Sequence, residues 1–141
     1  MQIKEKDCTN TSDHKLKVAH TYVERGFSVI PIKTDGSKKP AIPWRVYQQR
    51  IPTVEELNKW FGNGQSFDIG IVTGKVSNIA VVDIDSKEGI KYAEDHNFSN
   101  TPTVKTARGT HLYYKHQDGV GNFAGTNSPF RGIDLRGEGG Y

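Results

Sequence analysis

The stretch Asn78–Asp85, with the sequence NIAVVDID, is typical of a β-strand that ends in two carboxylates. Successive side chains of a strand alternate between its faces, so Asp83 and Asp85 share one face while the valine and isoleucine beside them face the core. Two carboxylates roughly 7 Å apart on one face suit Mg2+ or Mn2+, which prefer oxygen ligands. One alternative stays open: Asp85 and Glu88 form a capping box for a following helix, and Asp83 only marks the strand end.

Further strands are expected on both sides of this stretch. Phe67–Thr73 precedes it across the turn Gly74–Ser77, and we expect these two strands to pair as neighbours. The elements expected after it are a helix over 87–96, strands over 103–107 and 110–115 joined as a hairpin at Arg108-Gly109, and a strand over 132–136.

The N-terminal half also mixes helices with strands. Residues 1–11 are polar, and we expect them to be disordered. The elements expected next are a helix from the N-cap Ser12 to Arg25, a strand over 27–32, a loop over 34–43, and a short helix that opens with a Thr53/Glu56 capping box and ends near Phe61. Because helices and strands mix without regular βαβ alternation, the pattern favours the α+β class.

Length and composition limit the classes to which the chain can belong. Its 141 residues fit one domain, expected over 12–141. No apolar run approaches the roughly 18 residues of a membrane span, and the N-terminus lacks the apolar segment of a secretory signal, so we expect a cytoplasmic protein with no membrane partner. The single cysteine, Cys8, excludes an intrachain disulfide and a multi-cysteine zinc site.

The net charge of +3 is too small to identify a nucleic-acid-binding protein, but its distribution is informative. Residues 1–50 hold ten Lys or Arg against five Asp or Glu, residues 51–100 hold four against eight, and residues 101–141 hold five against three. An acidic middle between basic flanks fits a carboxylate metal site with basic groups that receive phosphates. Solvated surface charges are the alternative interpretation for most of these residues.

Two residues in later strands are candidates for the same site. Asp134, between Ile133 and Leu135, would supply the third carboxylate of a site for two ions, although a local ion pair with Arg131 or Arg136 explains it too. His111 suits either a structural hydrogen bond or a contact with phosphate.

A basic loop in the N-terminal half is a candidate for nucleic-acid contact. Lys38 and Lys39 lie in it, and Trp44 follows closely. Basic groups beside an aromatic ring suit phosphate contact and base stacking, whereas solvated loop lysines are the alternative interpretation.

Six short segments follow one another in an order that carries a family resemblance. They are GFSVIPI at 26–32, KPAIPW at 39–44, IGIVTG at 69–74, VVDID at 81–85, TARGTHLYY at 106–114 and GIDLRGEGGY at 132–141. Together they resemble the bifunctional DNA primase/polymerase (prim-pol) domain of the archaeo-eukaryotic primase superfamily, from about residue 15 to the end. The fold that the resemblance implies is a catalytic sheet resembling an RNA-recognition module, packed with an N-terminal α/β part.

The resemblance implies a role for each matching residue. Asp83 and Asp85 match the metal-binding acidic pair of the family, and Asp134 matches its third metal-binding acid. His111 matches the motif histidine that contacts the phosphates of the incoming nucleotide, and Arg136 lies in the closing signature. The implied cofactors are two Mg2+ or Mn2+ ions, and the implied substrates are a single-stranded DNA template and nucleoside triphosphates.

The chain departs from the family in two respects. Some members carry a cysteine-rich zinc-binding insertion, which one cysteine cannot build, so we expect no structural zinc. Members usually continue beyond the Gly-Gly-Tyr, so we expect Tyr141 to end a fragment that lacks its C-terminal strand or strands. The longer protein would carry a downstream helicase or other replication module, as in plasmid, phage and prophage replication proteins.

The resulting hypothesis is template-directed nucleotidyl transfer. The three aspartates would hold two ions, and His111 with Arg108 or Arg136 would bind phosphates through charge-assisted hydrogen bonds. The main alternative is a non-catalytic module that binds single-stranded nucleic acid or recognises an origin. A third hypothesis is a nucleotide-sugar transferase that uses Asp83-Ile84-Asp85 as its metal motif.

Overall fold

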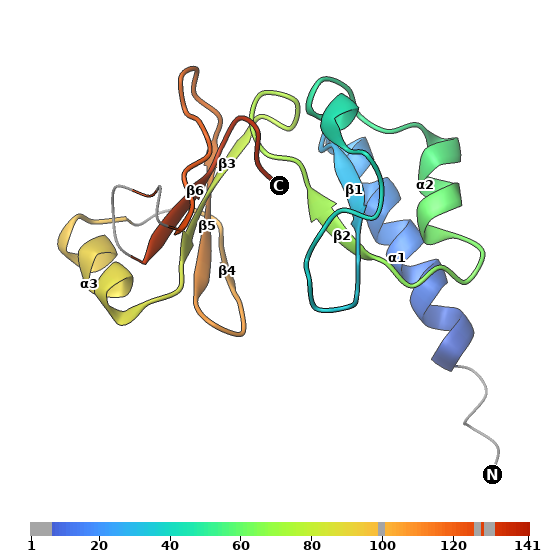
Figure 1. The fold of residues 1–141 in the computed structure, drawn as a ribbon, viewed down its shortest axis with the longest axis horizontal. Coiled ribbons are helices and arrows are strands. Elements are labelled where there is room, and N and C mark those ends of the chain that lie inside the picture. Colours follow the sequence, from blue (N-terminus) through green and yellow to red (C-terminus); the bar gives the residue numbers. More distant parts are fainter. Residues whose placement is uncertain (1–6, 99–100, 126–127, 129–131) are drawn as a thin grey trace, which may run out of the picture. The chain divides into compact units, whose positions relative to one another are not determined.

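The computed structural model describes residues 7–98, 101–125, 128 and 132–141. Within these residues it has three α-helices and two antiparallel sheets, which confirms the predicted α+β class (Figure 1). The chain divides into two compact units, Met1–Val72 and Thr73–Tyr141, and each contains one of the sheets. No helix in the described part of the chain is long and apolar enough to cross a membrane.

The first unit begins with a longer helix than the sequence predicts. Its elements are α1 (Asp7–Glu24), β1 (Val29–Ile32), the 3-10 turn η1 (Arg45–Gln48), α2 (Val54–Phe61) and β2 (Asp68–Ile71). Because α1 starts at Asp7, the predicted N-cap at Ser12 is wrong. The predicted disorder of residues 1–11 stays a prediction, and residues 1–6 lie outside the described residues. Composition misses this turn because backbone hydrogen bonds can extend an existing helix over polar residues.

The sheet of the first unit corrects a predicted strand pairing. All four residues of β1 are buried, and β1 pairs antiparallel with β2 from Val29 opposite Ile71 to Ile32 opposite Asp68. The predicted pairing of 67–73 with 78–85 is therefore wrong. Only an isolated bridge between Gly74 and Ile79 joins the two sides of that turn, because the chain passes from one unit to the other at this point.

Helix α2 starts where the sequence predicts. The Thr53 hydroxyl accepts the Glu56 backbone N–H, and the Glu56 carboxylate accepts the Thr53 backbone N–H, which is the predicted capping box. The helix buries Leu57, Trp60 and Phe61 in the core of this unit.

The second unit is a four-stranded sheet with one helix. Its elements are β3 (Ile79–Ile84), α3 (Lys87–Asp95), β4 (Thr103–Lys105), β5 (Thr110–Lys115) and β6 (Ile133–Arg136). The strand order is β4-β5-β3-β6, and every neighbouring pair is antiparallel. The predicted β4–β5 hairpin is confirmed, and a four-stranded sheet is also the platform of RNA-recognition modules.

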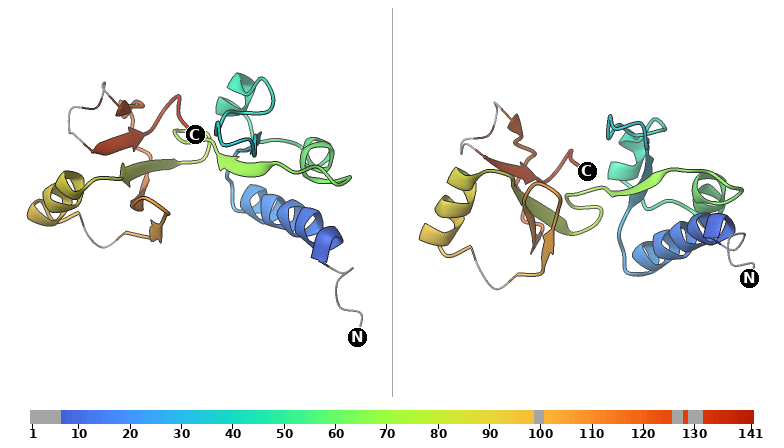
Figure 2. Two further views of the ribbon diagram at one scale, coloured as in Figure 1. Left: turned by 60° about the horizontal axis from the view of Figure 1, so that its bottom comes forward. Right: turned by 90° about the horizontal axis from the view of Figure 1, so that it is seen from below.

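Helix α3 covers one face of this sheet (Figure 2). Ile84, Leu112 and Ile133, from β3, β5 and β6, form a buried cluster with Ala93 of α3. The N-cap of α3 is Ser86, whose hydroxyl accepts the Gly89 backbone N–H at 2.9 Å, so the alternative capping box of Asp85 with Glu88 is wrong. Side chains that alternate with this cluster lie on the opposite face.

Candidate functional site

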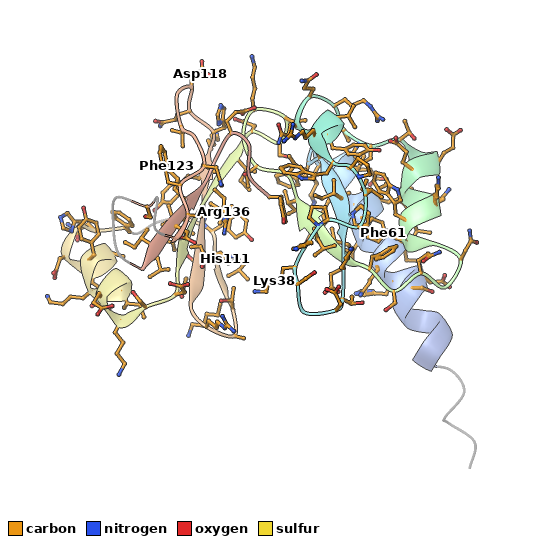
Figure 3. All side chains as sticks on the ribbon, viewed as in Figure 1. Lys38, Phe61, His111, Asp118, Phe123 and Arg136 are labelled. Atoms are coloured by element: carbon orange, nitrogen blue, oxygen red, sulfur yellow. The ribbon has the colours of Figure 1, made fainter. Side chains whose placement is uncertain are left out.

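Three candidate residues lie in one row across the centre of the four-stranded sheet. Asp83 of β3 is directly opposite His111 of β5 on one side and directly opposite Asp134 of β6 on the other. The row lies on the face away from α3, where Figure 3 shows His111. The sequence predicts each residue separately, and strand register brings them together.

The row is half-buried, and His111 and Asp83 are in contact within it. The His111 Nε2 lies 3.4 Å from the Asp83 Oδ1, with the two side chains 34% and 26% exposed. The Asp134 carboxylate, 24% exposed, accepts the backbone N–H of Gly125 at 2.9 Å and lies 3.7 Å from the Arg136 guanidinium. The alternative prediction, a local ion pair of Asp134 with Arg131 or Arg136, is therefore met in part, because Asp134 contacts Arg136. Arg131 lies outside the described residues.

Two carboxylates directly opposite each other on neighbouring strands repel, which makes this an unfavourable pair unless a cation offsets the charge. The Arg136 guanidinium beside Asp134 offsets part of this charge, and the His111 imidazole lies beside Asp83. Carboxylate oxygens are the ligands that Mg2+ and Mn2+ prefer, so the donor set fits the implied ions. Nevertheless, no three His, Cys, Asp or Glu side chains among the described residues are grouped closely enough to hold a metal.

Asp85 stands outside the row. Strand β3 ends at Ile84, so Asp85 is the first residue beyond it and its side chain is exposed. Its backbone N–H donates to the Gly132 carbonyl at 3.4 Å, and a Cβ added to Gly109 would lie 2.9 Å from its Cα. The backbone at Asp85 is therefore held between two glycines. The sequence places Asp85 in the strand because alternation does not reveal where pairing stops.

The two candidate arginines occupy different environments. Arg108 is exposed in the β4–β5 turn, which the Thr106 backbone N–H closes by donating to the Gly109 carbonyl at 2.9 Å. Arg136 lies in β6 on the same face as Asp134, two residues along the strand (Figure 3). Both positions suit a guanidinium that meets phosphate.

The candidate template residues belong to the first unit. Lys38 and Lys39 are exposed in the loop after β1, and Trp44 is half-buried just before η1. Within this loop the Asp35 carboxylate accepts the Ser37 backbone N–H at 2.9 Å, and hydrogen bonds from Ser37 lower the pKa of Asp35. The turn fixes the local backbone, while the proposed contact with template remains a prediction.

Sequence reasoning missed the backbone contribution of Gly125 to the site. The segment around Phe123 pairs with β6 through two backbone hydrogen bonds with Leu135, at 2.8 and 2.7 Å. This pairing brings the Gly125 N–H to Asp134. The sequence between Gln117 and Gly132 has no strand pattern that would predict this pairing.

Comparison with known proteins identifies one family. No curated protein is similar enough in sequence to count as a relative. A family model described as bifunctional DNA primase/polymerase, N-terminal, matches residues 19–141, a range that includes part of the first unit and all of the second.

Proposed function

Because the chain belongs to the bifunctional DNA primase/polymerase family, we propose that it joins nucleotides on a single-stranded DNA template, with Asp83, Asp134 and His111 at the reacting centre. The family carries primase and polymerase activity in DNA replication. The observation that supports this site is the row in which Asp83 lies opposite both His111 and Asp134.

The proposed metal ligands are Asp83 and Asp134, with the exposed Asp85 as the third carboxylate. Two Mg2+ or Mn2+ ions bound there would lower the pKa of the attacking 3′-hydroxyl and offset the charge of the departing pyrophosphate. The chain presents two of the carboxylates from hydrogen-bonded neighbouring strands, so their separation is set by the sheet before any ligand binds.

We assign phosphate binding to the basic residues on and beside the row. The His111 imidazole would donate to a phosphate oxygen, and its contact with Asp83 would orient the ring. Arg108 would add charge-assisted hydrogen bonds to phosphate, while Arg136, on the other side of the row, is a second candidate for contact with the nucleotide. Phosphate groups would then lie along β5 between the row and the β4–β5 turn.

Residues of the first unit would bind the template. Lys38, Lys39 and Trp44 would hold the template strand, so binding to single-stranded DNA would weaken steeply as salt rises. We further propose a role in plasmid or phage replication, a cytoplasmic location and a helicase or other replication module as partner.

Primer synthesis and primer extension test the catalytic proposal. We expect Asp83→Asn and Asp134→Asn to lower product by roughly 100-fold or more with Mn2+ or Mg2+, because each removes a charged ligand. The matched control is Asp118→Asn, whose side chain is 100% exposed and lies outside the row. Mn2+ should also raise the Tm of the wild type and not that of Asp83→Asn. Equal product from Asp83→Asn and the wild type would sink the proposal.

A second candidate is a non-catalytic module that binds single-stranded nucleic acid. It is favoured by one observation, the lack of a grouped set of three metal-binding side chains among the described residues. A Mn2+ titration separates the two functions. A module without a metal site would form no product, and its affinity for dATP would be the same with and without Mn2+.

A further inference from the structure

A second row of side chains lies beside the candidate site on the same face of the sheet. Tyr113 of β5 is directly opposite Val81 of β3, and Val81 is directly opposite Arg136 of β6. These residues are two positions along their strands from the first row, so the rows are separated by roughly 7 Å. The side chains on this face are thus mainly acidic in the first row, and include an aromatic ring and a guanidinium in the second row, two residues further along the strands.

The second row, Tyr113, Val81 and Arg136, is buried at its centre and partly exposed at its two ends, and is called the seat below. Val81, at its centre, is only 8% exposed, whereas Tyr113 is half-buried and the Arg136 side chain is 35% exposed. The rings of Tyr113 and His111 meet edge to face, with centroids 6.4 Å apart. Tyr113 therefore directly adjoins the group to which we assign phosphate contact. Tyr114, the next residue, packs against the core cluster on the face that α3 covers.

The order of groups along β5 sets the direction of a bound nucleotide. Arg108 lies on one side of His111, in the turn before the strand, and Tyr113 lies on the other. Phosphates held by His111 and Arg108 would leave the nucleoside to extend toward Tyr113. The distance between rows is similar to the distance from phosphate to nucleoside in a nucleotide. Aromatic side chains stack on the faces of all bases.

We infer that Tyr113 and Arg136 hold the nucleoside of the incoming nucleotide, with the base or sugar against the Tyr113 ring and Val81 as the floor. The inference rests on the proposed function, because it assumes that a nucleotide is the ligand of the first row. It adds a nucleoside-binding residue, Tyr113, to a site otherwise made of phosphate and metal contacts.

The test compares binding of dATP and of inorganic tripolyphosphate, which has no nucleoside, by calorimetry in one Mg2+ buffer. We expect Tyr113→Ala and Tyr113→Leu to weaken dATP binding about 10-fold or more and tripolyphosphate binding less than twofold. Tyr113→Phe, which keeps the ring, should bind both like the wild type. His111→Ala should weaken both ligands.

Tyr114→Leu is the matched control, since it makes the same change on the opposite face of the same strand. It should lower the Tm without changing the ratio of the two affinities. The inference is overturned if Tyr113→Ala weakens both ligands equally, weakens neither, or weakens only single-stranded DNA binding. It is also overturned if the wild type binds no dATP.

Primer extension by the same proteins separates this inference from the proposed function. A wild type that binds dATP through Tyr113 but makes no product would support the nucleoside seat and refute the catalytic proposal. A wild type that extends primers, with dATP binding unaffected by Tyr113→Ala, would refute the seat alone.

Discussion

Glu56 makes a dense set of contacts at the start of α2, and we predict that its ionisation controls the acid stability of the first unit. Its carboxylate accepts hydrogen bonds from the Thr53 backbone N–H and from the Tyr47 hydroxyl, each at 2.8 Å. It also accepts hydrogen bonds from two nitrogens of the Arg50 guanidinium, at 2.7 and 2.8 Å. The hydrogen bonds from Arg50 are the largest influence, and the pKa of Glu56 falls from 4.5 to about 2. The test compares the unfolding free energy of Glu56→Gln with that of the wild type as the pH is lowered.

The lowered pKa fixes the sign and the pH window. Since the folded protein binds the Glu56 proton less readily than the unfolded chain, the stabilisation is complete above about pH 4.5 and is lost as the pH falls toward 2. The full shift corresponds to about 3 kcal/mol at roughly 1.4 kcal/mol per pKa unit. The Glu56 and Arg50 side chains are 25% and 44% exposed, so solvent screening reduces the expected value to about 1 to 2 kcal/mol.

Urea unfolding followed by tryptophan fluorescence measures this contribution. Both tryptophans, Trp44 and Trp60, lie in the first unit, and Trp60 is 6% exposed with its ring against Tyr47. Between pH 5 and pH 2.5, the wild type should lose about 1 to 2 kcal/mol more unfolding free energy than Glu56→Gln. Glu55→Gln, an exposed change in the same turn, should behave like the wild type. Parallel pH profiles for the wild type and Glu56→Gln would refute the reasoning.

Three further changes test the second unit, each measured by urea unfolding with far-UV circular dichroism. In Gly109→Ala, the new Cβ would lie 1.8 Å from the Ile84 carbonyl oxygen, so the turn must shift. We expect the free energy of unfolding to fall by about 1 to 3 kcal/mol and the Mn2+-induced rise in Tm to become smaller. Thr73→Val removes the hydroxyl that donates to the Gly137 carbonyl at 2.7 Å in a buried site, which should cost about 1 to 3 kcal/mol. Leu112→Ala opens a cavity at a side chain that is 6% exposed and should cost about 2 to 5 kcal/mol. Unchanged midpoints would contradict each expectation.

Local sequence patterns predicted most elements of the fold because their causes are local. The Thr53/Glu56 capping box marks the start of α2, and alternation around Asp83 places that residue on the polar face of β3. Alternation assigns faces but not neighbours. The prediction that the segments around β2 and β3 pair with each other is wrong for this reason. Strand β2 pairs with β1, and β3 belongs to the other sheet.

The sequence predicts which residues belong to the candidate site, but it does not predict how they are placed in space. His111, Asp83 and Asp134 lie opposite one another through the register of three strands, and register depends on packing between segments far apart in the chain. The end of β3 before Asp85 and the amide that Gly125 offers to Asp134 depend on tertiary pairing as well. Their roles in catalysis remain predictions that the experiments above test.

The pairing of β6 with β3 links the acidic row to correct folding. A shift of β6 by one residue would place Ile133 or Leu135 opposite Asp83 and would turn Asp134 toward the face that α3 covers. The same shift would expose Ile133, which is 5% exposed in the core cluster. A misregistered molecule would thus lose the Asp134 carboxylate from the row and lose stability at the same time, so a stable folded form that lacks this carboxylate in the row should not accumulate.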